Sequence, residues 1–191
     1  MEKDRLAAFS DGVIAIIITI MVLELKVPHG SDWPALASLL PVFVSYVLSF
    51  IYVAIYWNNH HHLIYTVSRV NGLILWANMH LLFWLSLVPF ATAWMGENNF
   101  AKLPTAVYGF ALLMPAIAYF WLQKAIIHVQ GENSALAKAL GNDIKGKISP
   151  ALFLMAIPLA FVSPWISNAL FVIVALIWLI PDRRIEKILA E

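Results

Sequence analysis

The chain has 191 residues, of which 62% are hydrophobic and 12% are charged. A soluble domain carries roughly 25% charged residues, so this chain has too few polar side chains to cover a water-exposed globule. Its formal net charge of +1 is too small to indicate binding to nucleic acid. The absence of cysteine excludes disulfides and thiol chemistry. The composition therefore predicts an integral membrane protein.

Six apolar segments are long enough to cross a bilayer as helices, which takes about 17 to 20 residues. They cover about residues 6–27, 34–57, 71–95, 104–128, 148–163 and 165–181. The alternating pattern of a membrane barrel is absent from the sequence. We expect a single all-α domain over residues 1–191, and a retained first span because no small-residue cleavage site follows it.

The basic residues predict how these spans are oriented. With six spans, both termini share one side of the membrane with the second and fourth loops. Of the lysines and arginines, only Lys26 and Lys102 fall on the other side. The positive-inside rule therefore places both termini in the cytoplasm. The fourth loop, 128–147, is too short for a domain, and Ser134 is expected to cap a short helix that stops before Gly141.

The first span carries a line of mostly apolar residues along one side. At about 100° per residue, this line contains Gly12, Ile16, Ile20, Leu23 and Val27. Thr19 lies about 60° to one side of it. Several copies around a shared axis would turn this line into stacked apolar rings, which can gate a pore by dewetting. Periodicity alone also fits an ordinary packing surface.

A charged motif opens the same span. Arg5, Phe9, Ser10 and Asp11 have the spacing R-x-x-x-F-S-D, and "YWNNHH" ends the predicted second span. Ionisable groups inside a span mark a functional site by default. Together with Trp57, His60, Asn78 and the later "LSLVPF", the motif resembles the transmembrane protein 175 family, which comprises lysosomal and prokaryotic potassium channels.

The resemblance covers the whole six-span layout and implies a function. A single six-span unit implies a prokaryotic homotetramer in the cell membrane that conducts potassium ions and needs no cofactor. The first helix of each subunit would line an hourglass pore. The family's constriction falls on Ile16, its threonine layer on Thr19, and further apolar rings on Ile20 and Leu23, which together form a hydrophobic gate.

The resemblance also implies a polar network at the base of the pore helix. Its members here would be Arg5, Ser10, Asp11 and His60, with His61 an open alternative to His60. On an ideal helix Asp11 points about 140° away from the line of Ile16. Arg5 and Asp11 do not share a helix face, so we expect the second helix or a neighbouring subunit to join them.

Other functions are weighed against the channel. A proton-coupled or proton-permeable transporter that uses Asp11 and the histidines is the main alternative, although broken spans and inverted repeats are not evident. An intramembrane enzyme is not expected, because no catalytic arrangement lies within any span.

Two further polar sites have open interpretations. The histidines of "NNHHH", residues 58–62, point about 100° apart on a helix, so an interfacial cluster is favoured over a zinc site. Glu24 and Lys26 either tune the ion concentration at the outer mouth of a pore or anchor the helix at the headgroups.

Overall fold

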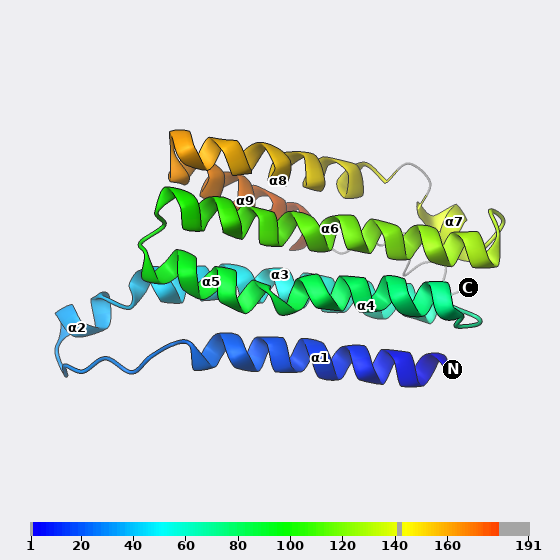
Figure 1. The fold of residues 1–191 in the computed structure, drawn as a ribbon, viewed down its shortest axis with the longest axis horizontal. Helices are drawn as coiled ribbons and strands as arrows, with labels where there is room; N and C mark the ends of the chain where they lie inside the picture. The colour runs from blue at the N-terminus through cyan, green and yellow to red at the C-terminus, as the bar shows by residue number, and fades with distance from the viewer. Residues whose placement is uncertain (1, 141–142, 180–191) are drawn as a thin grey trace.

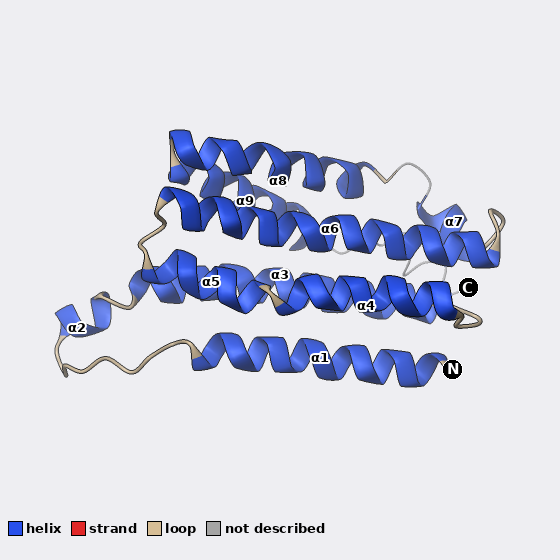
Figure 2. Cartoon of the chain, in the orientation of Figure 1, coloured by secondary structure: helices blue, strands red, loops and turns tan. Residues whose placement is uncertain are grey.

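The chain is helical almost throughout the residues that the computed structural model describes, which are 2–140 and 143–179. Within these residues no strand is present, and short loops join the helices (Figure 2). In chain order the helices are α1 (Lys3–Leu23), α2 (Trp33–Ala37), α3 (Leu40–Tyr65), α4 (Gly72–Ser86), α5 (Val88–Glu97), α6 (Lys102–Gln130), α7 (Ala135–Leu140), α8 (Ile144–Val162) and α9 (Pro164–Leu179).

The long helices have the length and hydropathy of membrane spans. Five stretches of the described chain qualify: α1, α3, the combined α4 and α5, α6 and α8. α9 is apolar but shorter, at 16 residues. The chain is therefore an all-α integral membrane protein, as the sequence predicts. The count of six spans and the cytoplasmic termini stay predictions.

The helix in the region of the second span differs from the predicted bounds of 34–57. The structure separates α2 from a longer helix, α3, which begins at Leu40 with Pro41 in its first turn, where proline is well tolerated. At the other end the polar run continues the helix to Tyr65. The amide of Asn59 is used inside the helix, because its Nδ2 donates to the Ile55 carbonyl at 2.8 Å. The helix is therefore longer at this end than the predicted span, and the bounds of the span within the membrane stay a prediction.

The third predicted span, 71–95, is almost continuous but is divided at Leu87 into α4 and α5. Pro89 explains the division, because it has no backbone N–H and its ring clashes with the carbonyl four residues earlier. At the start of α4, Asn71 Oδ1 accepts from the backbone N–H of Ile74 at 2.9 Å and caps the helix. The short cytoplasmic-loop helix predicted after Ser134 is present as α7.

The helices form layers around α6, the span with the largest buried share. In Figure 1, α6 runs between the α4–α5 pair and the α8–α9 hairpin, and α1 lies at the edge of the bundle. α1 packs against α3, α4 and α5. This edge position leaves one side of α1 without a neighbour in the described chain.

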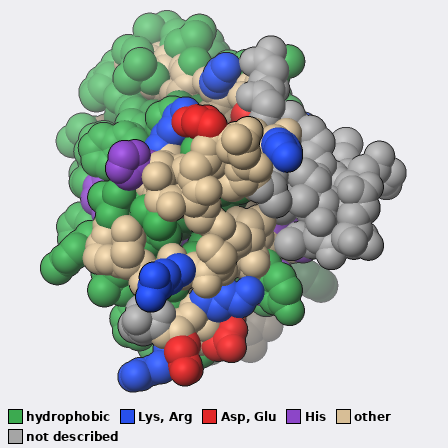
Figure 3. All heavy atoms as spheres, turned by 90° about the vertical axis from the view of Figure 1, so that its right-hand side faces the viewer, with side chains coloured by type: hydrophobic (Ala, Val, Ile, Leu, Met, Phe, Trp, Pro, Cys, Tyr) green, Lys and Arg blue, Asp and Glu red, His purple; other side chains and the backbone are tan. Residues whose placement is uncertain are grey.

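The end of the bundle at which α1 starts differs from its flanks. Figure 3 views this end directly: charged side chains of both signs gather on it, and apolar side chains dominate the upper and left-hand edges of the view. A polar end between apolar flanks is the distribution that a bilayer requires.

The pore-helix candidate and its polar anchor

α1 has one thoroughly buried side. Its members recur every three or four residues and are at most 2% exposed: Leu6, Ser10, Ile14, Ile17 and Met21. This spacing puts them on one side of a helix. The four apolar members pack into the core cluster that α1 shares with α3, α4 and α6.

The opposite side of α1 carries all four predicted pore residues. Ile16 is 60% exposed, Ile20 43% and Leu23 72%. Thr19 is also exposed, and its hydroxyl donates to the Ala15 carbonyl at 2.9 Å. The structure therefore places these four residues together on the side of α1 that has no neighbour within the described chain.

A buried chain of hydrogen bonds joins α1 to two other helices. Asn78 Nδ2, from α4, donates to the Ser10 Oγ at 3.0 Å, and Asn78 Oδ1 lies 2.7 Å from His60 Nε2 of α3. The Ser10 hydroxyl in turn donates to the Leu6 carbonyl at 2.9 Å. All three side chains are at most 1% exposed. Because a neutral amide oxygen only accepts, His60 Nε2 carries the hydrogen in this arrangement.

His60 and His61 have different surroundings. His60 is buried in this chain of bonds, whereas His61 is exposed and its ring lies near those of Trp57, His62 and Tyr65. The structure therefore gives the buried contact with α4 to His60.

Asp11 is fixed to α3 by a separate bond. Its Oδ1 accepts a hydrogen bond from Trp57 Nε1 at 2.9 Å, and the side chain is half-buried. The base of α1 is thus attached at two adjacent residues, Ser10 toward α4 and Asp11 toward α3. Asn78 and Trp57 belong to the predicted motif set, but the sequence did not show that they are the direct partners.

Arg5 does not join this network within one copy of the chain. Its side chain is exposed, and it forms no ion pair with any of the residues described. The structure therefore brings together Ser10 with His60 through Asn78, and Asp11 with Trp57, and it leaves Arg5 apart from them.

At the other end, the loop after α1 is tied to α5. Lys26 Nζ and Glu97 Oε1 lie 2.7 Å apart, with both side chains well exposed. The hydrogen bond to Glu97 and its negative charge raise the pKa of Lys26 above the ordinary 10.5. The sequence flagged Lys26 but gave no sign of Glu97, because the two are far apart in the chain.

The histidine run does not form a ligand set. In the part of the chain that the structure describes, no three His, Cys, Asp or Glu side chains are grouped to hold a metal ion. The fold and the site together define a helical membrane protein whose first span is anchored by polar bonds on one side and presents a line of exposed apolar residues on the other.

Comparisons with known proteins agree with this class. Residues 5–89 match the model of the family described as endosomal/lysosomal potassium channel TMEM175. A protein of Chryseobacterium sp. (strain P1-3) named a potassium channel is 59% identical over 100% of both chains. The crystal structure of a lysosomal potassium-selective channel TMEM175 homolog from Chamaesiphon minutus matches with a TM-score of 0.82, 32% identity, and coverage of 95% of this chain and 98% of that one.

A chicken protein named endosomal/lysosomal proton channel TMEM175 is 32% identical over 48% of this chain and 21% of its own length. The chain belongs to the TMEM175 family. The family consists of ion channels, so the chain is not an enzyme.

Proposed function

We propose that the chain is the subunit of a potassium-selective channel in a prokaryotic cell membrane, with both termini in the cytoplasm. Four copies assemble with α1 of each lining a common pore. The channel function is supported by relatives named potassium channels, one of them 59% identical over the full chain. The arrangement of the pore is supported by the two-sided α1.

The observation that carries the proposal is the exposed side of α1. Ile16, Ile20 and Leu23 are 60%, 43% and 72% exposed on a helix whose other side is almost fully buried. Three bulky aliphatic residues in line, on an edge helix, give four copies a set of stacked apolar rings. A single helix cannot enclose an ion path, so the rings require further copies of the chain.

An isoleucine ring at Ile16 is the proposed constriction. Aliphatic side chains offer a passing ion no oxygen to replace lost water, so passage depends on how readily the ion sheds its hydration shell. Potassium holds its shell less tightly than sodium. A narrow apolar ring therefore favours potassium without a filter of backbone carbonyls.

The polar anchor holds this helix at the correct depth and rotation. Ser10 and Asp11 bond to two different helices, so α1 cannot turn about its axis without breaking one of the two contacts. Arg5 is exposed at the same end of α1. We propose that it completes the network with a carboxylate of the neighbouring subunit.

Proton permeation is a second candidate function. The chicken relative, which matches over 48% of this chain and 21% of its own length, is named a proton channel. In this chain Asp11 is half-buried, and the exposed His61 and the partly buried His62 follow Trp57 along α3. A relay through these groups would make a pH gradient alone drive current, whereas the potassium pathway requires a potassium gradient.

The test is the reversal potential of the purified protein in planar bilayers with potassium on one side and sodium on the other. We expect the wild-type channel to favour potassium, and Ile16→Asn to shift the reversal potential toward zero because a polar constriction stays wet and admits sodium. Val22→Asn is the matched control, since Val22 is 44% exposed but lies about 120° from Ile16 around the helix.

Unchanged selectivity in Ile16→Asn would place the constriction elsewhere, with Ile20 or Leu23 next. A current that follows only the pH gradient would favour the proton pathway over the potassium pathway.

A further inference from the structure

A hollow opens between α6 and α8, away from α1. α6 has 29 residues and α8 has 19, so at about 1.5 Å per residue α6 is roughly 15 Å longer. Figure 1 shows α8 starting short of the end of α6, in the half of the bundle where α1 begins. The turns at the C-terminal end of α6 therefore extend beyond the start of α8 and are not covered by it.

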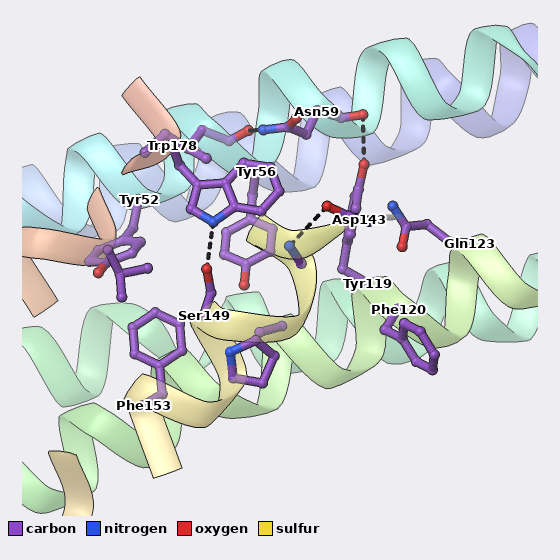
Figure 4. Close-up of a pocket in the computed structure, with 15 residues that line it drawn as sticks. Tyr52, Tyr56, Asn59, Tyr119, Phe120, Gln123, Asp143, Ser149, Phe153 and Trp178 are labelled. Atoms are coloured by element: carbon purple, nitrogen blue, oxygen red, sulfur yellow. Dashed lines mark hydrogen bonds between the residues drawn. The ribbon is translucent and has the colours of Figure 1, made fainter. Parts of the chain in front are cut away.

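The part of the hollow nearer the middle of the bundle is apolar. Its volume is about 50 Å³, which is room for about four water-sized groups, and its walls come from α3, α6, α8 and α9. Large rings dominate these walls: Tyr52, Tyr56, Phe120, Phe153 and Trp178 (Figure 4).

Most polar groups on these walls are already paired within the protein. Trp178 Nε1 donates to the Ser149 Oγ at 2.7 Å, and the Tyr119 hydroxyl donates to the Asn59 carbonyl at 3.1 Å (Figure 4). Asp143 Oδ1 accepts from the backbone N–H of Gly146 at 3.0 Å and caps α8 (Figure 4). An apolar chain fits such walls better than a polar molecule does.

A second, polar part adjoins the first. It has a volume of about 210 Å³ and shares Phe120, Gln123, Asp143 and Gly146 with the apolar part. Charged side chains of both signs line it: Lys124, Lys147, Glu132 and Asp143. The Lys124 ammonium lies 5.6 Å from the centre of the Phe120 ring, where the two parts meet.

The apolar part followed by the charged part matches the order of acyl chain and headgroup in a phospholipid. An acyl chain would enter the apolar part, an ester carbonyl would come within reach of Tyr56, and the headgroup would lie among the charges. The exposed Lys124 matches a phosphate, and the exposed Glu132 matches a positive group beside it. A headgroup with only a negative charge would also face Glu132 and Asp143 and would gain less.

We propose that this hollow binds one phosphatidylethanolamine molecule, with part of an acyl chain in the apolar part and the phosphate and primary ammonium in the polar part. The site is distinct from the proposed pore and does not depend on which ion is conducted. A choline headgroup fits less well, because a quaternary ammonium cannot donate hydrogen bonds to carboxylates.

The proposal is tested by native mass spectrometry of the full chain, stripped of lipid in mild detergent. Dioleoyl phosphatidylethanolamine, phosphatidylcholine and phosphatidylglycerol are titrated separately, so that only the headgroup differs. We expect phosphatidylethanolamine to bind at the lowest concentration, with one high-affinity molecule per chain.

Two variants locate the site. Lys124→Gln should weaken phosphatidylethanolamine binding about three- to tenfold, because one cation for the phosphate is lost. Lys102→Gln, an exposed lysine at the opposite end of the same helix, should leave binding unchanged. Ala116→Leu narrows the apolar part and should weaken the binding of lipids with any headgroup.

Equal binding of the three lipids, or tighter binding of phosphatidylglycerol, would overturn the proposal. Equal affinity of the Lys124→Gln and Lys102→Gln variants for phosphatidylethanolamine would overturn it as well. This result would mean that the lipid binds only around the outside of the bundle. Because Lys124 is exposed, its substitution tests the site without disturbing the core.

Discussion

Asn78 uses both ends of its amide to join two other helices. Its nitrogen donates to Ser10 of α1, and its oxygen lies at hydrogen-bond distance from His60 of α3. The amide donates from its nitrogen and accepts at its oxygen, so two separate atoms of one side chain reach two different helices. Both polar ends of Asn78 are thus used within the protein at a position that is 0% exposed.

Asn78→Ala should therefore lower the free energy of unfolding by about 1–2 kcal/mol, because it leaves Ser10 and His60 buried without this partner. Thermal unfolding of the purified protein in detergent measures the effect. Asn98→Ala is the control, since the Asn98 amide is exposed and bonds only to the Trp94 carbonyl of its own helix. Equal unfolding temperatures for the two variants would show that the buried hydrogen bonds of Asn78 do not stabilise the fold.

At the residue scale, the sequence predicts which polar residues matter but not which of them form hydrogen bonds with each other. Ser10, Asp11, Trp57, His60 and Asn78 are all recognisable as members of one motif set. Which pairs touch depends on how α1, α3 and α4 pack, and that is set by buried apolar side chains such as Leu6 and Ile14, which look like any other aliphatic residues in the sequence. The motif predicted the anchor, but the bond partners needed the fold.

At the scale of elements, the close contact of α3 with α5 rests on a glycine. A Cβ at Gly96 would lie 2.5 Å from the Ser45 Oγ and 2.7 Å from the Val42 Cα. Both distances are too short, and the second involves the backbone, so the two helices would have to separate. Small residues permit such close packing in membrane bundles, where van der Waals contact holds helices together.

We expect Gly96→Ala to cost about 1–3 kcal/mol of stability through this overpacking. Gly72→Ala should be neutral or slightly stabilising, since nothing lies within 4 Å of its added methyl group and alanine favours the helix. Unfolding temperatures of both variants, compared with wild type, check the contrast. A loss at Gly72 as large as that at Gly96 would point to a general intolerance of glycine substitution.

The ends of the helices were the least predictable part of the fold. Hydropathy located the apolar stretches and predicted a second span at 34–57, but it gave no sign that the helix itself runs from Leu40 to Tyr65. In the structure Asn59 bonds within its own helix and His60 is buried, so the helix continues. Polarity indicates a membrane boundary only where the side chains face water.

The loop that follows α1 is tied to α5 by a pair of exposed charges, and this makes a prediction about pH. The pKa of Lys26 is raised in the folded protein by its hydrogen bond to Glu97. A raised pKa means that the pair stabilises the fold fully below the unfolded pKa and loses this effect as the pH rises through the folded pKa. We expect a small difference in unfolding temperature between wild type and Lys26→Met at pH 8.

This difference should vanish as the pH rises above 10.5, and it should shrink in high salt because both side chains are exposed. Parallel melting curves at several pH values measure it. A difference that persists unchanged at high pH would assign the effect to the methylene chain of Lys26 and not to its charge.

At the scale of the whole molecule, the hydrogen bonds that hold α1 lie inside the bundle, and its exposed apolar residues lie outside. α6 and the α8–α9 hairpin form a scaffold, and α1 is held at the edge with Ile16, Ile20 and Leu23 turned away from the bundle. In a monomer this side would face only lipid. The proposed homotetramer gives it a function, because four copies can enclose the path that one copy leaves open.

The absence of cysteine makes this assembly directly testable, since one introduced cysteine is then the only thiol in the chain. Leu23→Cys places a thiol at the C-terminal end of α1, at a position 72% exposed. If four α1 helices surround a narrow axis, mild oxidation should convert most of the protein to disulfide-linked dimers on a denaturing gel, because a disulfide requires Cα atoms within about 7 Å. Met155→Cys, 55% exposed on α8, should stay monomeric on that gel because α8 lies far from the proposed axis. Equal cross-linking at both positions would indicate random collision, and none at Leu23 would place α1 away from the centre of the assembly.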